Sequence, residues 1–230
     1  MPRQPTKVSI TRQQKEILLG ILLGDAHIEV SPNGKSARLK IEQASKKRDY
    51  VEHLHQVFCD WSPGNIVAAT NSNNIKFSTA FCTSILFYHS AFYGDEGRKV
   101  PRWIEHSFTS RSLAYLIMDD GGTKSKESKA IYINVYGLPR REQESLCGIL
   151  IRKFGLQAKV VKDRQYCRMF ISGYSYEDLV ALIDPYILPS LRYKIPPPRK
   201  GGISKASQEF GVLSDRKDKS LDETTELPKR

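Results

Sequence analysis

An apolar segment that ends in an aspartate occurs twice in this 230-residue chain, 95 residues apart. The first copy occupies residues 19–26 and places Asp25 near its end, and the second occupies residues 113–121 and places Asp120 near its end. Internal repetition constrains a fold strongly, because both copies must build the same structural unit. The sequence therefore predicts a pseudo-dimer whose two halves each bring one carboxylate to a common place.

A second short pattern repeats at the same offset. Lys99-Val100-Pro101 begins 74 residues after Asp25, and Lys194-Ile195-Pro196 begins 74 residues after Asp120. An isolated lysine is normally a solvated surface residue, so only the shared spacing singles out these two. We expect each half to contribute one acid and one base.

Composition limits the class of protein. The formal net charge is +11, and only two of these excess charges come from residues after Pro198. A basic folded region indicates a polyanionic partner, with nucleic acid first and an anionic membrane surface second. No run of about 18 apolar residues is present, so no membrane span is expected. The four cysteines form no CxxC pair and residues 1–7 lack the apolar core of a secretory signal, which favours a protein that is not secreted.

Local patterns predict the same order of elements in both halves. Thr11 and Gln14 have the form of a capping box that opens a helix to about Gly24, and Ser110 or Ser112 is expected to cap a helix that ends at Asp120. Alternation and 3.6-residue periodicity predict the remaining elements. They are strands at 37–42, 65–69, 74–79, 131–136, 159–164 and 168–172, and helices at 46–58, 141–154, up to about 93 and 175–185.

The expected fold class is therefore α+β, with two pseudo-symmetric αββαββα halves whose helices pack on saddle-shaped antiparallel sheets. The halves are expected at 11–108 and 109–198. A basic N-terminal extension, 1–10, precedes them, and the polar tail 199–230, with little apolar periodicity, is predicted to be disordered.

The two repeated aspartates stand where a carboxylate is unfavourable. A helix C-terminus carries about −0.5 charge, so a carboxylate there costs roughly 0.3 to 1 kcal/mol, and two such ends side by side repel each other. A costly arrangement that is used twice suggests a bound cation. Oxygen ligands favour Mg²⁺ over zinc, and paired metals suit an in-line phosphoryl displacement. Gly20 and Gly24, four residues apart on the first helix, would let a second backbone approach closely.

Basic residues alternate with apolar ones along the predicted strands. Each alone is more often a solvated strand residue, but two such sheets would form a basic surface that fits a DNA major groove. Most contacts would go to phosphates, including those from Lys46, Lys47, Arg48, Lys124 and Lys126. The candidate DNA-binding residues on the strands are Arg38, Lys40, Lys76, Tyr132, Asn134, Lys159, Lys162, Arg164 and Arg168.

This set of motifs resembles the LAGLIDADG homing endonucleases, and in particular the monomeric, intron-encoded type with two motif copies in one chain. The resemblance extends from about Thr11 to about Pro198, although Ala26 stands where the motif usually has Gly. It implies a site-specific, metal-dependent double-strand DNA endonuclease that acts as a monomer on a long, weakly palindromic target. It also implies Mg²⁺ as cofactor, with Mn²⁺ as a substitute.

The same resemblance assigns residue roles, with Asp119 open as either a helper acid or a solvated neighbour. The candidate site residues are catalytic Asp25, Asp120, Lys99 and Lys194, with Gly24 and Asp119 beside the two acids in the metal site. Two alternatives remain: a maturase that binds intron RNA, and a non-cleaving DNA-binding regulator, against which the presence of both acids argues. An organelle intron would place the protein in a chloroplast or mitochondrion, and otherwise a bacterial cytoplasm is expected.

Overall fold

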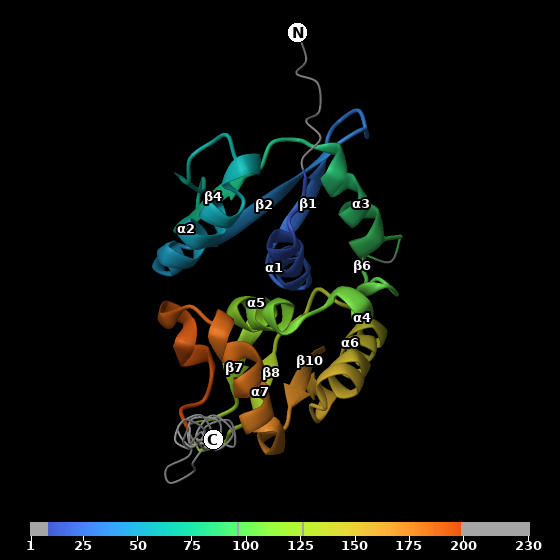
Figure 1. Cartoon of the computed structure of the whole chain (residues 1–230), viewed down its shortest axis with the longest axis vertical. Helices are drawn as coiled ribbons and strands as arrows, with labels where there is room; N and C mark the ends of the chain where they lie inside the picture. The colour runs from blue at the N-terminus through green and yellow to red at the C-terminus, as the bar shows by residue number, and fades with distance from the viewer. Residues whose placement is uncertain (1–8, 96, 126, 199–230) are drawn as a thin grey trace, which may run out of the picture. The chain divides into compact units, whose positions relative to one another are not determined.

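The computed structural model describes residues 9–95, 97–125 and 127–198 (Figure 1). Most of the N-terminal extension, the candidate Lys126 and the tail predicted to be disordered lie outside the described residues. The described residues up to Pro196 pack as one compact unit. Among the described residues, no helix combines the length and apolar character needed to cross a bilayer.

Each half has the predicted order of helix, two strands, helix, two strands and helix. The first half contains α1 (Arg12–Leu23), β1 (His27–Val30), β2 (Ala37–Ala44), α2 (Arg48–Val57), β3 (Val67–Ala68), β4 (Asn74–Ser78) and α3 (Thr83–Phe92). The second contains α5 (Ser110–Asp120), β7 (Gly121–Thr123), β8 (Ile131–Ile133), α6 (Arg140–Phe154), β9 (Ala158–Asp163), β10 (Tyr166–Ile171) and α7 (Tyr176–Ile183). The αββαββα prediction is confirmed.

Three short elements join the halves and were not predicted from the sequence. They are the hairpin strands β5 (Tyr93–Gly94) and β6 (Gly97–Arg98), and the one-turn helix α4 (Ile104–Ser107). Two 3-10 turns also prove relevant to the site: η1 (Ser45–Lys47) leads into α2, and η5 (Pro189–Lys194) follows α7.

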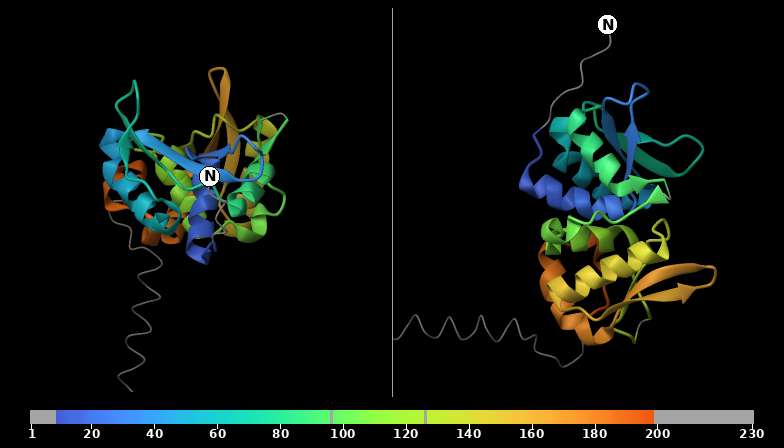
Figure 2. Two further views of the ribbon diagram at one scale, coloured as in Figure 1. Left: turned by 90° about the horizontal axis from the view of Figure 1, so that it is seen from above. Right: turned by 90° about the vertical axis from the view of Figure 1, so that its right-hand side faces the viewer.

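The strands form two four-stranded antiparallel sheets with matching connectivity. Their orders are β1-β2-β4-β3 and β7-β8-β10-β9. Along β2, Leu39 and Ile41 are buried in the core, as predicted, whereas Arg38 and Lys40 lie on the opposite face. We call this second side the open face of each sheet. Figure 2 shows the hairpins of both halves extending toward the same side of the α1–α5 pair.

Both central helices begin with a capping box. Thr11 and Gln14 form the predicted one, with each side chain accepting a hydrogen bond from the other residue's backbone N–H. In α5 the N-cap is Thr109 rather than Ser110 or Ser112, so that prediction was wrong. The box needs a second side chain three residues later, and Ser112 supplies it by accepting from Thr109 N at 3.2 Å.

Helices α1 and α5 lie side by side (Figure 2). They run in the same direction, because Gly20 is close to Ser112 and Gly24 is close to Asp119. A Cβ added to Gly20 would lie 2.4 Å from Ser112 O, and a Cβ added to Gly24 would lie 2.4 Å from Asp119 Oδ2. Both distances are too short for any side chain. The approach of another backbone is thus confirmed at Gly20, whereas Gly24 leaves room for the Asp119 side chain. The close packing brings the C-terminal ends of α1 and α5 together.

Candidate active site

The two repeated acids meet at the adjoining C-terminal ends of α1 and α5. Asp25 follows Gly24, the C-cap of α1, and Asp120 is the last residue of α5. Burial, and secondly repulsion from the Asp25 carboxylate, raise the pKa of Asp120 to about 7. The Asp25 side chain is 41% exposed, so this acid pair is open to solvent on one side. A cation bound here would relieve the repulsion.

The second acid of α5, Asp119, lies inside the helix interface. It is 6% exposed, and its carboxyl oxygens accept hydrogen bonds from Asp25 N at 3.1 Å and Gln43 Nε2 at 3.3 Å. Burial, and secondly the Asp25 carboxylate, raise the pKa of Asp119 to about 8, which favours its neutral form. Asp119 is therefore a buried group that fixes the backbone of Asp25, and not a solvated neighbour.

Gln43 is a site residue that the sequence interpretation missed. It is the inward-facing residue near the end of β2, and it is 6% exposed. Its Nε2 donates to Asp25 Oδ2 at 2.7 Å, and its Oε1 accepts from Lys47 Nζ at 2.7 Å. Lys47 Nζ also lies 3.8 Å from Asp25 Oδ2. The sequence pattern that could have identified Gln43 is its position: it is a polar amide two residues after Ile41, where the alternation of Leu39 and Ile41 predicts a buried side chain.

At each helix end, a cation donates to the backbone carbonyls. Lys194, the last residue of η5, is 8% exposed, and its Nζ donates to Asp119 O. Burial, and secondly the charge of Lys47, lower the pKa of Lys194 to about 8. On the other helix, Arg98 Nη2 donates to Gly24 O at 2.9 Å and also to Leu22 O. Because Gly24 and Asp119 are equivalent in the 95-residue repeat, Arg98 and Lys194 occupy matching positions.

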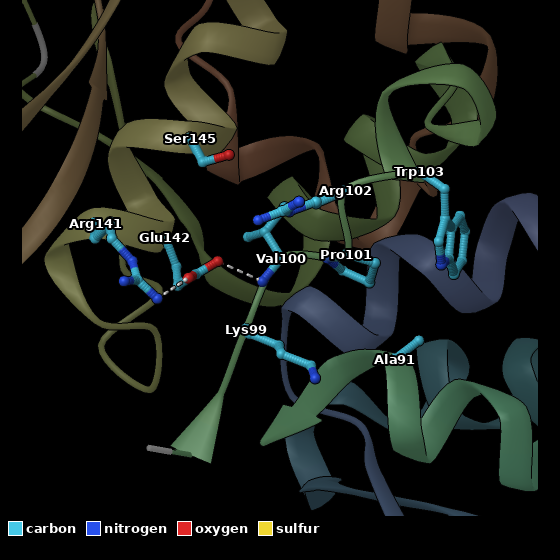
Figure 3. A pocket seen from close by; sticks show the side chains of 9 residues that line it. All are labelled: Ala91, Lys99, Val100, Pro101, Arg102, Trp103, Arg141, Glu142 and Ser145. Atoms are coloured by element: carbon cyan, nitrogen blue, oxygen red, sulfur yellow. Dashed lines mark hydrogen bonds and ion pairs between the residues drawn. The ribbon is translucent and has the colours of Figure 1, made fainter. Parts of the chain in front are cut away.

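Lys99 lies elsewhere. Its side chain packs near Gly94 and lines a cavity of about 660 Å³ beside α6, together with Val100, Arg102 and Glu142 (Figure 3). Neighbouring residues of an extended segment point to opposite sides, so Arg98 and Lys99 cannot both face the acids. The structure brings together Asp25, Asp119, Asp120 and Lys194, and it adds Arg98 where the repeat pointed to Lys99.

Most of the candidate DNA-binding residues on the strands lie on the open faces. Lys162 does not, because it pairs with Cys167 on the face opposite to Arg168. Arg164 is at the tip of the β9–β10 hairpin with a positive φ of 55°, and Asn134 follows β8 and donates its N–H to Asp120 O. Lys46 and Lys47 lie in η1, Arg48 begins α2 and Lys124 follows β7. The strand residues on the open faces are Arg38, Lys40, Lys76, Tyr132, Lys159 and Arg168.

The donor set decides which metal the site could hold. Among the described residues, no three His, Cys, Asp or Glu side chains form a closed ligand cluster, as a structural zinc site would require. Two carboxylates, those of Asp25 and Asp120, are available, and the carbonyls of Gly24 and Asp119 already accept hydrogen bonds from cations. This set fits Mg²⁺, which is commonly held by one or two carboxylates together with waters and substrate phosphates.

Comparisons with known proteins agree with this geometry. The LAGLIDADG DNA endonuclease family matches residues 15–179. The probable intron-encoded endonuclease 1 of Wickerhamomyces canadensis is 29% identical over 201 residues, which cover 81% of this chain and 85% of that protein. The cytochrome b mRNA maturase bI2 of Debaryomyces hansenii is 28% identical over 199 residues, which cover 81% of this chain and 74% of the maturase.

A solved structure is also similar over most of the chain. The homing endonuclease I-WcaI bound to its DNA recognition sequence superposes with a TM-score of 0.74 and 25% identity, over 84% of this chain and 89% of that one. The family match spans well over half of the chain. This chain belongs to the LAGLIDADG DNA endonuclease family.

Proposed function

We propose that this protein is a site-specific homing endonuclease that hydrolyses both strands of a double-stranded DNA target with the aid of divalent metal ions. One observation carries the proposal: Asp25 and Asp120, one from each half, meet at two helix ends where they repel each other, and each helix end also holds a cation. Two acid–cation pairs related by pseudo-symmetry suit two strands of a duplex.

Asp25 and Asp120 are the residues that would hold the metal, with Mg²⁺ as the expected ion and Mn²⁺ as a substitute. Bound metal supplies positive charge at the scissile phosphate and a more acidic water. The protein contributes the rest. Arg98 and Lys194 place positive charge where the phosphate gains negative charge in the transition state, and the lowered pKa of Lys194 also suits it to a proton transfer.

Gln43 and Asp119 act by positioning. The Gln43 amide holds the Asp25 carboxylate from one side, and the Asp119 carboxyl holds the Asp25 backbone N–H. A carboxylate held in this way loses little freedom when it binds a metal, which is the benefit of a pre-organised site. Any side chain at position 24 would collide with the Asp119 carboxyl, so only glycine fits there.

The DNA duplex is proposed to lie across the two open faces. Their strand residues include the basic side chains of Arg38, Lys40, Lys76, Lys159 and Arg168, and the hairpins of both halves extend to that side (Figure 2). The similar protein I-WcaI is seen bound to its DNA recognition sequence. A relative named as intron-encoded supports an intron-borne gene, and an organelle as the site of action if the intron is located there.

A second candidate activity is assistance to RNA splicing. The observation that favours it is the 28% identity to a cytochrome b mRNA maturase over most of both chains. It would be tested by adding the purified protein to the unspliced transcript of the gene that carries this coding region. Splicing that does not accelerate at any protein concentration would remove this candidate.

The endonuclease is tested with the intronless allele of the host gene in a supercoiled plasmid. Asp25→Asn and Asp120→Asn each remove one proposed metal ligand while they keep the side-chain shape. We expect cleavage in Mg²⁺ to be lost in both variants, and binding in Ca²⁺ to survive because the open faces are unchanged. Cleavage by either variant at the wild-type rate would refute the assignment.

A further inference from the structure

One arginine of the first sheet is held on its open face by two different groups. Arg38 Nε donates to Glu29 Oε2 at 2.9 Å, and Arg38 Nη2 lies 2.9 Å from the same oxygen. Glu29 is directly opposite Arg38 on β1. The Arg38 guanidinium also lies over the Phe81 ring, with Cζ 4.7 Å from the centroid. The Arg38 side chain is 32% exposed, so its position is largely fixed before any ligand arrives.

The second sheet also places an arginine between a ring and a carboxylate, although this ion pair is longer than that of Arg38. Arg168 Cζ lies 3.6 Å from the centroid of the Tyr132 ring, and Arg168 Nη1 lies 3.4 Å from Asp163 Oδ2. Tyr136 Oη donates to the same Asp163 oxygen at 2.6 Å, which fixes the carboxylate in turn. Arg168 is 24% exposed and lies on the open face of β10.

The other cations of the open faces are held less firmly. Lys40 shares Glu29 at 3.4 Å but contacts no ring, and Lys159 lies over the Phe170 ring at 5.7 Å without an ion pair among the described residues. A lysine also presents a point charge on a flexible stem, whereas a guanidinium presents a planar fork. Each open face thus has one pre-oriented arginine among flexible lysines.

We propose that Arg38 and Arg168 read guanine, one in each half of the DNA target, and that Glu29 with Phe81 and Asp163 with Tyr132 orient them for it. The carboxylates engage only part of each guanidinium. In Arg38 the contacted side is that of Nε and Nη2, which leaves both Nη1 protons and one Nη2 proton for the O6 and N7 acceptors of guanine in the major groove. This inference rests on the proposed function, because it specifies how that enzyme chooses its site.

Simple sheet stabilisation explains these ion pairs less well. A carboxylate on a face that binds DNA repels the phosphates and lowers affinity for every sequence. The chain nevertheless places Glu29 and Asp163 on the two open faces, each against the arginine that also contacts a ring. Such a carboxylate is useful if it restricts an arginine to one orientation. It then lowers the affinity for all sequences but increases the difference in affinity between bases.

The test measures a binding profile in Ca²⁺ and a cleavage profile in Mg²⁺. The substrates are the intronless-allele target and every single base-pair substitution of it. For the wild type we expect a preference for guanine of about ten-fold or more at one position in each half of the target. Arg38→Lys should weaken the preference in one half only, because a lysine has no rigid fork for the two guanine acceptors, and Arg168→Lys should weaken it in the other half only.

The orienting residues give a second readout. Glu29→Gln and Asp163→Asn should tighten binding to all sequences, because a negative charge is removed, and should weaken the guanine preference at the same time. Arg111 provides a matched control, because Glu16 and the Tyr186 ring hold it similarly at the N-terminal end of α5, away from the acid pair. Arg111→Lys should leave the whole base profile unchanged.

Three results would overturn the inference: a wild-type profile without a preferred guanine, a uniform loss of affinity in Arg38→Lys and Arg168→Lys, or an unchanged profile in both carboxylate variants. Thermal unfolding identifies any variant that does not fold, and the remaining variants then decide. A wild-type protein that shows the expected binding profile but never cleaves would refute the proposed function and leave this inference standing.

Discussion

Replacement of Arg98 by Met, with Lys99→Met beside it as the control, tests which residue is the first-half counterpart of Lys194. Arg98 contacts two carbonyls at the end of α1, whereas Lys99 lines the cavity beside α6. Loss of one pre-oriented charge near a developing oxyanion typically lowers a rate by about 10² to 10³-fold. We expect Arg98→Met to show a loss of this size and Lys99→Met to remain within about three-fold of wild type.

Stability has to be separated from catalysis in this comparison. Arg98→Met leaves the carbonyls of Leu22 and Gly24 without their charged donor, which costs roughly 1 to 3 kcal/mol if no water replaces it. Arg98→Lys keeps the charge and one donor, so it should recover part of the rate. Thermal unfolding of all three variants shows whether a slow variant is merely unfolded at the assay temperature.

The assay is single-turnover cleavage of a supercoiled plasmid with saturating enzyme, which resolves nicked from linear product. If Arg98 and Lys194 each serve one strand, Arg98→Met should accumulate nicked plasmid, and Lys194→Met should accumulate plasmid nicked in the other strand. A large rate loss in Lys99→Met together with wild-type cleavage by Arg98→Met would refute the placement. Equal slowing of both strands, with no nicked product, would refute the assignment of one cation to each strand.

Four further outcomes are expected. Gly20→Ala should destabilise the protein by about 1 to 3 kcal/mol, because its Cβ would meet a backbone oxygen, whereas Gly64→Ala, in open space, should change thermal unfolding little. In EDTA, the melting temperature should fall as the pH rises from about 4 to about 8. The reason is that folding raises the pKa of the Asp119 carboxyl, so the protonated form favours the folded state and the ionised form disfavours it. Asp119→Asn should flatten this fall. Affinity for the target should drop roughly 10³ to 10⁵-fold between 50 and 200 mM salt if about six to ten phosphates are contacted, and a flat titration would exclude that contact set. Gln43→Leu should slow one strand more than the other, which strand-specific end labelling would detect.

The patterns that predicted the fold were local and periodic. The capping box of Thr11 and Gln14, the two apolar helices and the alternation at residues 37–42 depend only on nearby residues, so the order of elements in each half was predicted correctly. The β5–β6 hairpin was missed because two-residue strands have no detectable period. This hairpin orients the segment so that Arg98, and not Lys99, faces the acids.

The repeat also predicted more symmetry than the two halves have. The strand pairing sets Lys40 opposite His27 and Tyr132 opposite Gly122, so His27 and Gly122 keep the 95-residue offset while the following strand does not. The second hairpin is shorter by three residues. A constant offset therefore identifies equivalent residues along the helices, but it fails after the first turn in which the halves differ in length.

That shorter hairpin makes the two acid sites chemically unequal. With Lys40 equivalent to Tyr132, the counterpart of Gln43 is Val135, which is 2% exposed and has no polar side-chain atom. Asp25 thus has an amide donor at 2.7 Å that no equivalent residue offers to Asp120. The interface is unequal as well, since α5 inserts the Asp119 carboxyl against a glycine of α1. A single chain can hold such differences because each half is encoded separately. An asymmetric pair of sites would suit the weakly palindromic target that the family resemblance implies better than a symmetric pair would.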